Sequence, residues 1–310
     1  MVVVLVKVEQ WALQVPKKKG EETRQQLIAN GLLDTSLKPF TEGDTIFFPL
    51  ARPGEGGLQA SFEAHEKRLL PVARHELIGG IAVLQESDRA AAEALLASRP
   101  GIHTVLSTTS DVQGEYRTRE FEVLAGVHTT RTLIIEYGHR FTVDLSEAYF
   151  SPRLATERQR VLQQMTKGEA VLDMFAGVGP FAISLSKSAG FVVSSDINPA
   201  AVIMMKENCL DNHCTNVMPV LADSGRLSRI LPWKFNRVVM NLPLLAPQFL
   251  DEAFRLCLPG GTIHCYALVS SEGEHLEKIS SFQPSEVHEH MVRSYSPGKW
   301  HAVYEITAGK

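Results

Sequence analysis

Continuous apolar segments alternate with helical segments in the second half of the chain, and this alternation restricts the possible folds more than any other feature. The segments are AVLDMFAG, FVVSSDI, RVVMNLP and TIHCYALV. Runs of this kind are typical of strands buried on both faces of a parallel sheet. The stretches between them, such as AAVIMMKENCLDN and PQFLDEAFRLCL, predict helices. We therefore predict a doubly wound, Rossmann-like α/β domain over residues 146–310.

Two small α+β domains are predicted before it. Residues 1–58 hold strand-like VVVLVKVEQWALQV and TIFFPL, with a short helix between them that ends at Gly31. ARPGEGG, which ends at residue 57, predicts a linker because it is rich in Gly and Pro. Residues 62–145 contain several short β runs and the helix DRAAAEALLASRP, for which Asp88 is the expected N-cap.

Composition excludes several classes of protein. The net charge of −4 argues against non-specific coating of nucleic acid but allows a local basic face. The apolar start of the chain is interrupted at Lys7, and no other run approaches membrane-spanning length, so we expect a cytoplasmic protein with no membrane partner. The four cysteines form no CxxC pair and are expected to be reduced. His288 and His290 share one strand face, but no third ligand is nearby, so we expect solvated histidines and no metal.

Gly177 and Gly179 occupy a predicted strand-to-helix turn, where the backbone can approach a ligand closely. The pattern GxGxxA is shared by nicotinamide enzymes and methyltransferases and does not separate them. Three acids do. Asp173 is placed to bind an ammonium, Asp196 two ribose hydroxyls and Asp223 an adenine amino group. Together they indicate S-adenosylmethionine, although each acid has an alternative interpretation as a helix cap.

The next predicted strand ends in MNLPLLA, which contributes Asn241 and Pro243. Class I methyltransferases that act on amino nitrogens commonly carry Asn/Asp-Pro-Pro-aromatic at this point. Leu242 and Leu244 replace the second proline and the aromatic here, which disfavours a standard exocyclic-amine enzyme. A tight turn without chemistry is the alternative. The predicted cofactor contacts are Asp173, Phe175, Gly177, Gly179, Asp196, Ile197, Asp223 and Asn241.

With these residues together, the chain resembles the archaeal and eukaryotic type of tRNA (guanine-37, N1)-methyltransferase, a class I family dependent on S-adenosylmethionine. The motifs that carry the resemblance are YFSPRLATER, DMFAGVGPF, DINPAAV, MNLPLLAPQFLDEAF, GGTIHCYALV and RSYSPGKWHAVYEI, in the family's order from about Tyr116 to the C-terminus. The resemblance implies a monomer that binds the tRNA anticodon loop. It also implies that residues 1–58 dock on the tRNA elbow.

Catalysis by this family needs a base, because guanine N1 carries a proton, and a donor for the charge that develops at O6. The resemblance implies Glu157 as the base and Arg117 as the group at O6, with Asn241, Pro243 and Tyr149 shaping the guanine pocket. Desolvation that raised the pKa of Glu157 would make it a better base. Glu157 has an alternative role as an ordinary first-turn helix acid. Arg119 is a close rival of Arg117.

Several cations are candidates for tRNA phosphate contacts or, alternatively, for solvated surface positions: Lys17, Lys18, Lys19, Arg131, Arg140 and Arg153. Three other functions remain open. The nearest is a tRNA-wybutosine enzyme that transfers the aminocarboxypropyl group of the same cofactor. A nicotinamide-dependent oxidoreductase fits GxGxxA but gives Asp173 and Asp223 no role. The third is a non-catalytic RNA-binding protein.

Overall fold

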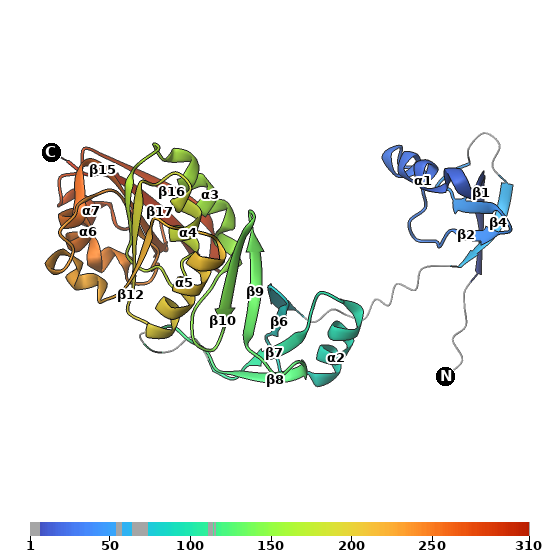
Figure 1. Cartoon of the computed structure of the whole chain (residues 1–310), viewed down its shortest axis with the longest axis horizontal. Helices are drawn as coiled ribbons and strands as arrows, with labels where there is room; N and C mark the ends of the chain where they lie inside the picture. The colour runs from blue at the N-terminus through green and yellow to red at the C-terminus, as the bar shows by residue number, and fades with distance from the viewer. Residues whose placement is uncertain (1–6, 54–57, 64–73, 111–113, 115, 310) are drawn as a thin grey trace. The chain divides into compact units, whose positions relative to one another are not determined.

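The computed structural model describes residues 7–53, 58–63, 74–110, 114 and 116–309, and the chain divides into two compact units, residues 1–71 and 72–310 (Figure 1). Each unit is described by itself. The predicted α/β class with additional small sheets is confirmed. The first five residues of the first predicted strand, residues 2–6, and residues 54–57 of the predicted linker lie outside the described residues.

The N-terminal unit is an antiparallel sheet with strand order β2-β3-β1-β4. Its elements are β1 (Lys7–Pro16), η1 (Lys17–Lys19), α1 (Gly20–Ala29), β2 (Phe40–Glu42), β3 (Thr45–Pro49) and β4 (Leu58–Glu63). Gly31 adopts a φ of 62° just after α1, where a residue without a Cβ is favoured. β4 pairs with β1 from Lys7 opposite Glu63 to Ala12 opposite Leu58. The boundary expected near residue 58 therefore falls inside this unit.

The second unit begins with a four-stranded sheet of order β5-β6-β7-β8. It comprises β5 (His75–Ile78), β6 (Ile81–Leu84), α2 (Arg89–Ser98), β7 (Thr104–Thr108) and β8 (Phe121–Gly126). α2 connects the parallel strands β6 and β7. The Asp88 side chain accepts a hydrogen bond of 2.9 Å from the Ala91 amide, which confirms the predicted cap.

A seven-stranded sheet of order β13-β12-β11-β14-β15-β17-β16 forms the largest part of the second unit. Its strands are β11 (Ala170–Asp173), β12 (Phe191–Asp196), β13 (Val217–Leu221), β14 (Phe235–Met240), β15 (Cys257–Val269), β16 (Glu286–Ser296) and β17 (Lys299–Thr307). The first five in spatial order are parallel, and β17 and β16 are antiparallel additions. The helices are η2 (Pro152–Leu154), α3 (Ala155–Gln164), α4 (Pro180–Ser186), α5 (Pro199–Asp211), η3 (Ser224–Arg229), η4 (Ala246–Phe249), α6 (Leu250–Leu256) and α7 (Leu276–Ser280).

A hairpin of β9 (Arg131–Glu136) and β10 (His139–Asp144) stands between the two sheets of this unit (Figure 1). Ile134 and Phe141 of the hairpin share one apolar core with Ile183 of α4 and Met205 of α5. The side chain of Asn208 on α5 accepts from the Thr142 amide at 2.8 Å and donates to its carbonyl at 3.1 Å. The shared core is the physical reason that residues 72–310 form one unit.

The four cysteines are free, and burial raises the pKa of Cys209, Cys257 and Cys265 to about 12, so they are inert packing groups as predicted. His288 and His290 are exposed on β16, and His288 lies 2.9 Å from Glu286. The described residues contain no group of three or more side chains suited to hold a metal. Among the helices of the described part of the chain, none has the length and apolarity needed to cross a bilayer.

Candidate active site

A cavity of about 420 Å³ opens beside the carboxyl ends of β11, β12, β13 and β14, which is where doubly wound sheets bind ligands. Most of the predicted site residues line it: Arg117, Tyr149, Phe175, Gly177, Asp196, Ile197, Asp223, Asn241 and Pro243. The predicted residues Glu157, Asp173 and Gly179 are not part of the lining. The fold therefore brings most of the predicted side chains together, although they come from loops far apart in the chain.

The glycine turn shapes one wall of the cavity. Gly177 and Gly179 have φ of 55° and 89°, values that favour glycine, and a Cβ on Gly179 would lie 2.9 Å from Cγ of Met205. The amide of Gly177 donates to Oδ2 of Asp196 at 2.7 Å, and the Asn198 amide donates to Oδ1 at 2.9 Å. These two bonds fix the Asp196 carboxylate at the cavity, while burial raises its pKa.

Asp173 ends β11 and is fully buried behind this turn. Burial, with the nearby charge of Asp196 second, raises the pKa of Asp173 to about 7. The backbone amides of Phe175 and Ala182 offset part of this shift, and no side chain of the described part of the chain bonds the carboxylate. A buried carboxylate of this kind is suited to pair with a cation.

Asp223 both caps a helix and lines the cavity. It caps η3 by accepting from the Gly225 amide at 2.9 Å, as the alternative interpretation expected, and it also lines the cavity. In the loop after β14, the carbonyl of Pro243 accepts from the Leu268 amide at 2.9 Å, which ties this loop to β15. Oδ1 of Asn241 is buried and has no partner among the described residues.

Arg117 and Tyr149 meet at the edge of the cavity. The guanidinium carbon of Arg117 lies 5.3 Å from the centre of the Tyr149 ring, a cation–π contact. Arg117 has a φ of 55°, which is uncommon for a residue with a Cβ and is often found at functional sites. Its rival Arg119 lines a second cavity of about 740 Å³, which Arg117 and Tyr149 also border.

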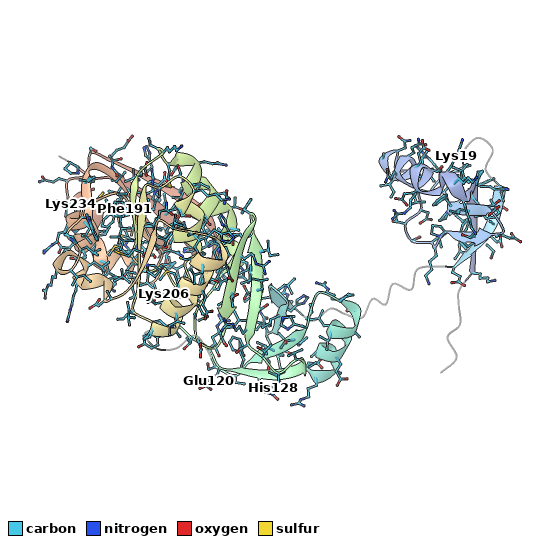
Figure 2. All side chains as sticks on the ribbon, in the orientation of Figure 1. Lys19, Glu120, His128, Phe191, Lys206 and Lys234 are labelled. Carbon is cyan, nitrogen blue, oxygen red and sulfur yellow. The ribbon has the colours of Figure 1, made fainter. Side chains whose placement is uncertain are left out.

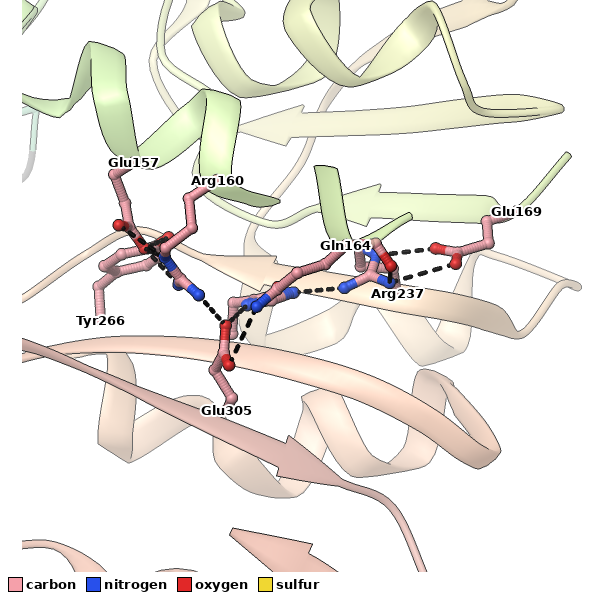
Figure 3. A network of polar contacts seen from close by, with 8 residues as sticks. Glu157, Arg160, Gln164, Glu169, Arg237, Tyr266 and Glu305 are labelled. Atoms are coloured by element: carbon pink, nitrogen blue, oxygen red, sulfur yellow. Dashed lines mark hydrogen bonds and ion pairs between the residues drawn. The ribbon is translucent and has the colours of Figure 1, made fainter. Parts of the chain in front are cut away.

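Glu157 lies in the first turn of α3 and is buried (Figure 3). Arg160 contacts its carboxylate with Nη2 at 2.5 Å from Oε1 and Nε at 3.0 Å from Oε2, and the Tyr266 hydroxyl donates to Oε1 at 2.8 Å. Burial favours a raised pKa, but these bonds and the charges of Arg160 and His290 outweigh it, so the pKa of Glu157 is lowered. The desolvation that would make Glu157 a better base is present, but its effect on the pKa does not prevail.

The contacts continue beyond Arg160 across three strands (Figure 3). Arg160 also reaches Glu305 on β17 at 2.5 Å, and Glu305 lies 3.3 Å from His264 on β15. Arg237 on β14 joins His264, at 2.7 Å, to Glu169, at 2.7 Å. This network anchors α3 to the sheet.

A second buried ion pair was missed by the sequence analysis. Arg158 on α3 makes two bonds of 2.6 Å with Glu136 at the end of β9, and both side chains are buried. The guanidinium lies between the rings of Phe150 and Phe181, at 5.8 and 5.7 Å from their centres. No local pattern indicates a partner that lies in another element and far along the chain.

The C-terminal hairpin contributes three further cavity residues that were not predicted: Arg293, Tyr295 and His301. They belong to the motif RSYSPGKWHAVYEI, which carried part of the family resemblance, but the motif by itself indicated no role for them. Only the pairing of β17 with both β15 and β16 brings them to the site.

The cationic candidates differ in their surroundings. Arg131 pairs with Glu207 at 2.5 Å and Arg153 with Glu76 at 3.0 Å. Lys17, Lys18 and Lys19 are exposed on η1 of the N-terminal unit, where Figure 2 labels Lys19. The exposed side chains of these lysines suit phosphate contact better than arginines that are already bound in ion pairs.

Comparison with known proteins identifies the family. The family described as TRM5/TYW2 methyltransferase domain matches residues 132–292, and the tRNA methyltransferase 5 N-terminal domain matches residues 12–57. The tRNA (guanine(37)-N(1))-methyltransferase Trm5b of Pyrococcus abyssi is 35% identical over 95% of this chain and 98% of its own length.

The chain belongs to the TRM5/TYW2 methyltransferase family.

Solved structures of family members have the same fold. The crystal structure of Pyrococcus abyssi Trm5b covers 97% of this chain and all of its own, with a TM-score of 0.75 and 34% identity. The complex of aTrm5 with tRNALeu covers 97% of this chain and all of its own, with a TM-score of 0.73 and 30% identity. Methanocaldococcus jannaschii TYW2 in complex with AdoMet covers 75% of this chain and 98% of its own, with a TM-score of 0.59 and 25% identity. Because the chain belongs to a methyltransferase family, the alternative function of a nicotinamide-dependent oxidoreductase is excluded.

Proposed function

We propose that this enzyme transfers the methyl group of S-adenosylmethionine to N1 of guanosine 37 in tRNA. The observation that carries the proposal is one cavity whose lining combines Asp196 and Asp223 with Arg117 and Asn241. The first pair suits a nucleoside cofactor, and the second pair can read a nucleobase edge. Two archaeal relatives named for this activity match 95% and 93% of the chain.

The residues present fit S-adenosylmethionine. Asp173 would hold the ammonium, because no side chain among the described residues bonds its buried carboxylate. Asp196 would accept the ribose hydroxyls, Asp223 would accept from the adenine amino group, and Gly177 lets the backbone approach closely. Phe175 and Ile197 supply apolar walls. When bound, the cofactor supplies an electrophilic methyl group on a sulfonium.

Glu157 is proposed to remove the N1 proton, and Arg117 to stabilise charge at O6. Arg117 is suited to this because its guanidinium borders the cavity and Nε has no partner among the described residues. Glu157 lies outside the lining, so its role as base requires the carboxylate to turn from Arg160 toward the cavity. Tyr149, Asn241 and Pro243 shape the pocket for the base.

The parts of the chain are proposed to divide the work. The N-terminal module, predicted as residues 1–58 and extended by β4, docks on the tRNA elbow through surfaces such as Lys17–Lys19. Residues 62–145 contribute to anticodon-loop binding, and residues 146–310 bind the cofactor. The structure of aTrm5 with tRNALeu supports tRNA as the partner. We also propose a cytoplasmic monomer, which sedimentation with and without tRNA and imaging of a tagged chain would test.

The second candidate is aminocarboxypropyl transfer onto a wybutosine precursor, because the matched family includes TYW2. The match of residues 12–57 to the tRNA methyltransferase 5 N-terminal domain favours methyl transfer. Nucleoside mass spectrometry of a guanosine-37 transcript after incubation with the protein and cofactor tests both. A single added methyl on guanosine 37 is expected; a heavier adduct or an unmodified nucleoside would refute the proposal.

A further inference from the structure

Four residues that line the cavity carry buried polar atoms without hydrogen-bond partners among the described residues. Nε of Arg117, Oδ1 of Asn241, Nε of Arg293 and both ring nitrogens of His301 are buried and have no hydrogen-bond partner among the described residues. All four residues line the cavity. Buried polar groups are hydrogen-bonded in more than about nine cases in ten, so such a cluster at one cavity indicates polar ligand recognition.

Sheet register explains how His301 reaches this position. On β15, β17 and β16, Leu268, His301 and Arg293 stand directly opposite one another. Opposed residues of neighbouring strands extend to the same face of a sheet, and all three line the cavity. The Leu268 amide donates to the carbonyl of Pro243, so the row continues into the loop after β14.

An irregularity in β16 lies at the end of this row. The pairing of β16 with β17 shifts between Met291 and Arg293 and again between Ser294 and Ser296. Bulges redirect side chains and are frequent beside active sites. Tyr295, which lies within the second shift, is half-exposed and also lines the cavity.

The imidazole of His301 is neutral at physiological pH. Burial, followed by the positive charge of Arg293, lowers the pKa of His301 to about 4; the Glu157 carboxylate opposes this shift, and Arg117 adds to it. A neutral imidazole has one donor and one acceptor nitrogen, whereas a guanidinium only donates. His301 is therefore able to offer a base edge either a donor or an acceptor, depending on its tautomer.

His301 contacts the residue that binds the proposed base. It is only 4% exposed, and its ring has a tilted contact with Tyr266 at 6.1 Å between centres. Tyr266 is the residue whose hydroxyl donates to Glu157, so His301 lies beside the proposed base and inside the cavity lining at once.

We propose that His301 hydrogen-bonds the target base in this cavity and is a specificity-determining residue of the reaction. The inference rests on the proposed function and deepens it. Arg293, opposite His301 on β16, assists as a second donor. Half-exposed Tyr149 and Tyr295 offer rings on which a flat base stacks beside these groups.

The experiment measures single-turnover methylation at saturating cofactor for His301→Leu, His301→Gln and His301→Asn. The substrates are transcripts with guanosine, inosine or adenosine at the target position. His301→Leu is expected to lose about tenfold to a hundredfold in rate on guanosine and to change the guanosine-to-inosine ratio, because a base contact is lost. Glutamine or asparagine, which retain a donor and an acceptor, should restore part of the rate. Affinity for S-adenosylhomocysteine should stay near that of the wild type.

His139→Leu is the matched control. His139 is also buried, with one ring nitrogen unpaired among the described residues, but it does not border this cavity. Its replacement should leave the guanosine-to-inosine ratio unchanged even if the protein is less stable. An unaltered rate and ratio in His301→Leu, or equal losses in both leucine variants without rescue, would overturn the inference alone. A wild-type enzyme that leaves guanosine 37 unmethylated would overturn the proposed function and this inference with it.

Discussion

Arg160 contacts both carboxylate oxygens of Glu157, with Nη2 2.5 Å from Oε1 and Nε 3.0 Å from Oε2. The ion pair keeps the proposed base ionised and restrains it outside the cavity lining. Because Arg160 is also bound to Glu305, it can remain in place when Glu157 turns away. Three of the predictions below concern the ionisation of buried carboxylates in this site.

Replacing Glu157 by Gln should abolish the base while retaining its shape. Single-turnover methylation should fall by about a hundredfold to ten-thousandfold. Affinities for tRNA and S-adenosylhomocysteine should be largely unchanged. Glu305→Gln is the control, because it changes a second carboxylate bound to Arg160 without touching the proposed base. Equal rates in wild type and Glu157→Gln would remove Glu157 from the mechanism.

Replacing Arg160 by Gln should raise the pKa of Glu157, because burial then acts with less opposition. The folded wild-type pKa lies below its ordinary value of 4.5, so ionised Glu157 stabilises the fold above that value and the benefit is lost in stronger acid. In Arg160→Gln the acid limb of the pH–rate profile should shift to higher pH. Arg255→Gln, which disrupts an exposed pair with Asp251, should not move it. Superimposable profiles would show that Arg160 does not set the ionisation of the base.

Cofactor affinity should increase with pH through the titration of Asp173, whose pKa is raised to about 7. Only the ionised carboxylate attracts the cofactor ammonium, so calorimetry with S-adenosylhomocysteine should give tighter binding at about pH 7.5 than at about pH 5.5. Asp173→Asn should bind weakly with little pH dependence, whereas Asp223→Asn should retain the dependence. A pH-independent wild type would contradict this role.

The raised pKa of Asp173 should also make the stability of the ligand-free protein depend on pH. The folded pKa of Asp173 lies above the unfolded one, so the protonated form is favoured by folding and stability falls as pH rises from about 4 to about 7. Asp173→Asn carries no such charge. The stability of Asp173→Asn relative to wild type should therefore increase over that range, seen in urea denaturation as a larger difference in the free energy of unfolding in favour of the variant. A constant difference would contradict the buried-charge argument.

Removing one partner of the Arg158–Glu136 pair should destabilise the protein strongly. Arg158→Met leaves a buried carboxylate unpaired, which costs about 3–5 kcal/mol. The double variant Arg158→Met, Glu136→Leu should recover much of the loss, because no charge is left unpaired. Arg255→Met, at an exposed pair, should cost no more than about 1 kcal/mol. Chemical denaturation compares the four proteins, and a mild effect of Arg158→Met would indicate that water reaches the pair.

Deleting residues 1–71 should weaken tRNA capture and leave cofactor affinity unchanged, because the described cofactor-site residues all lie in the second unit. Filter binding of tRNA and calorimetry of S-adenosylhomocysteine measure the two effects. Substituting Lys17, Lys18 and Lys19 by Gln in the full chain is the finer variant. Loss of cofactor binding in the truncated protein would show that the units depend on one another.

Much of the proposed cofactor site was brought to one sheet edge as the sequence predicted, because its residues follow strands directly. Apolar runs identify buried strands, and residues such as Asp173, Gly177 and Asp196 meet at one sheet edge whenever those strands are parallel. The same logic predicted Asn241 and Pro243 after β14. The family motifs added Arg117 and Tyr149, which local pattern alone left as surface residues.

The sequence by itself determined the α/β class, the family and nine residues of the cavity lining, since periodicity and local motifs are properties of neighbouring residues. Tertiary structure decided the rest. The pairing of β4 with β1 extended the first unit, the fold brought the Tyr266 hydroxyl of β15 to the Glu157 carboxylate, and the register of β15, β17 and β16 brought His301 into the cavity. These outcomes depend on contacts between residues far apart in the chain, whose distances and burial exist only once the chain has folded.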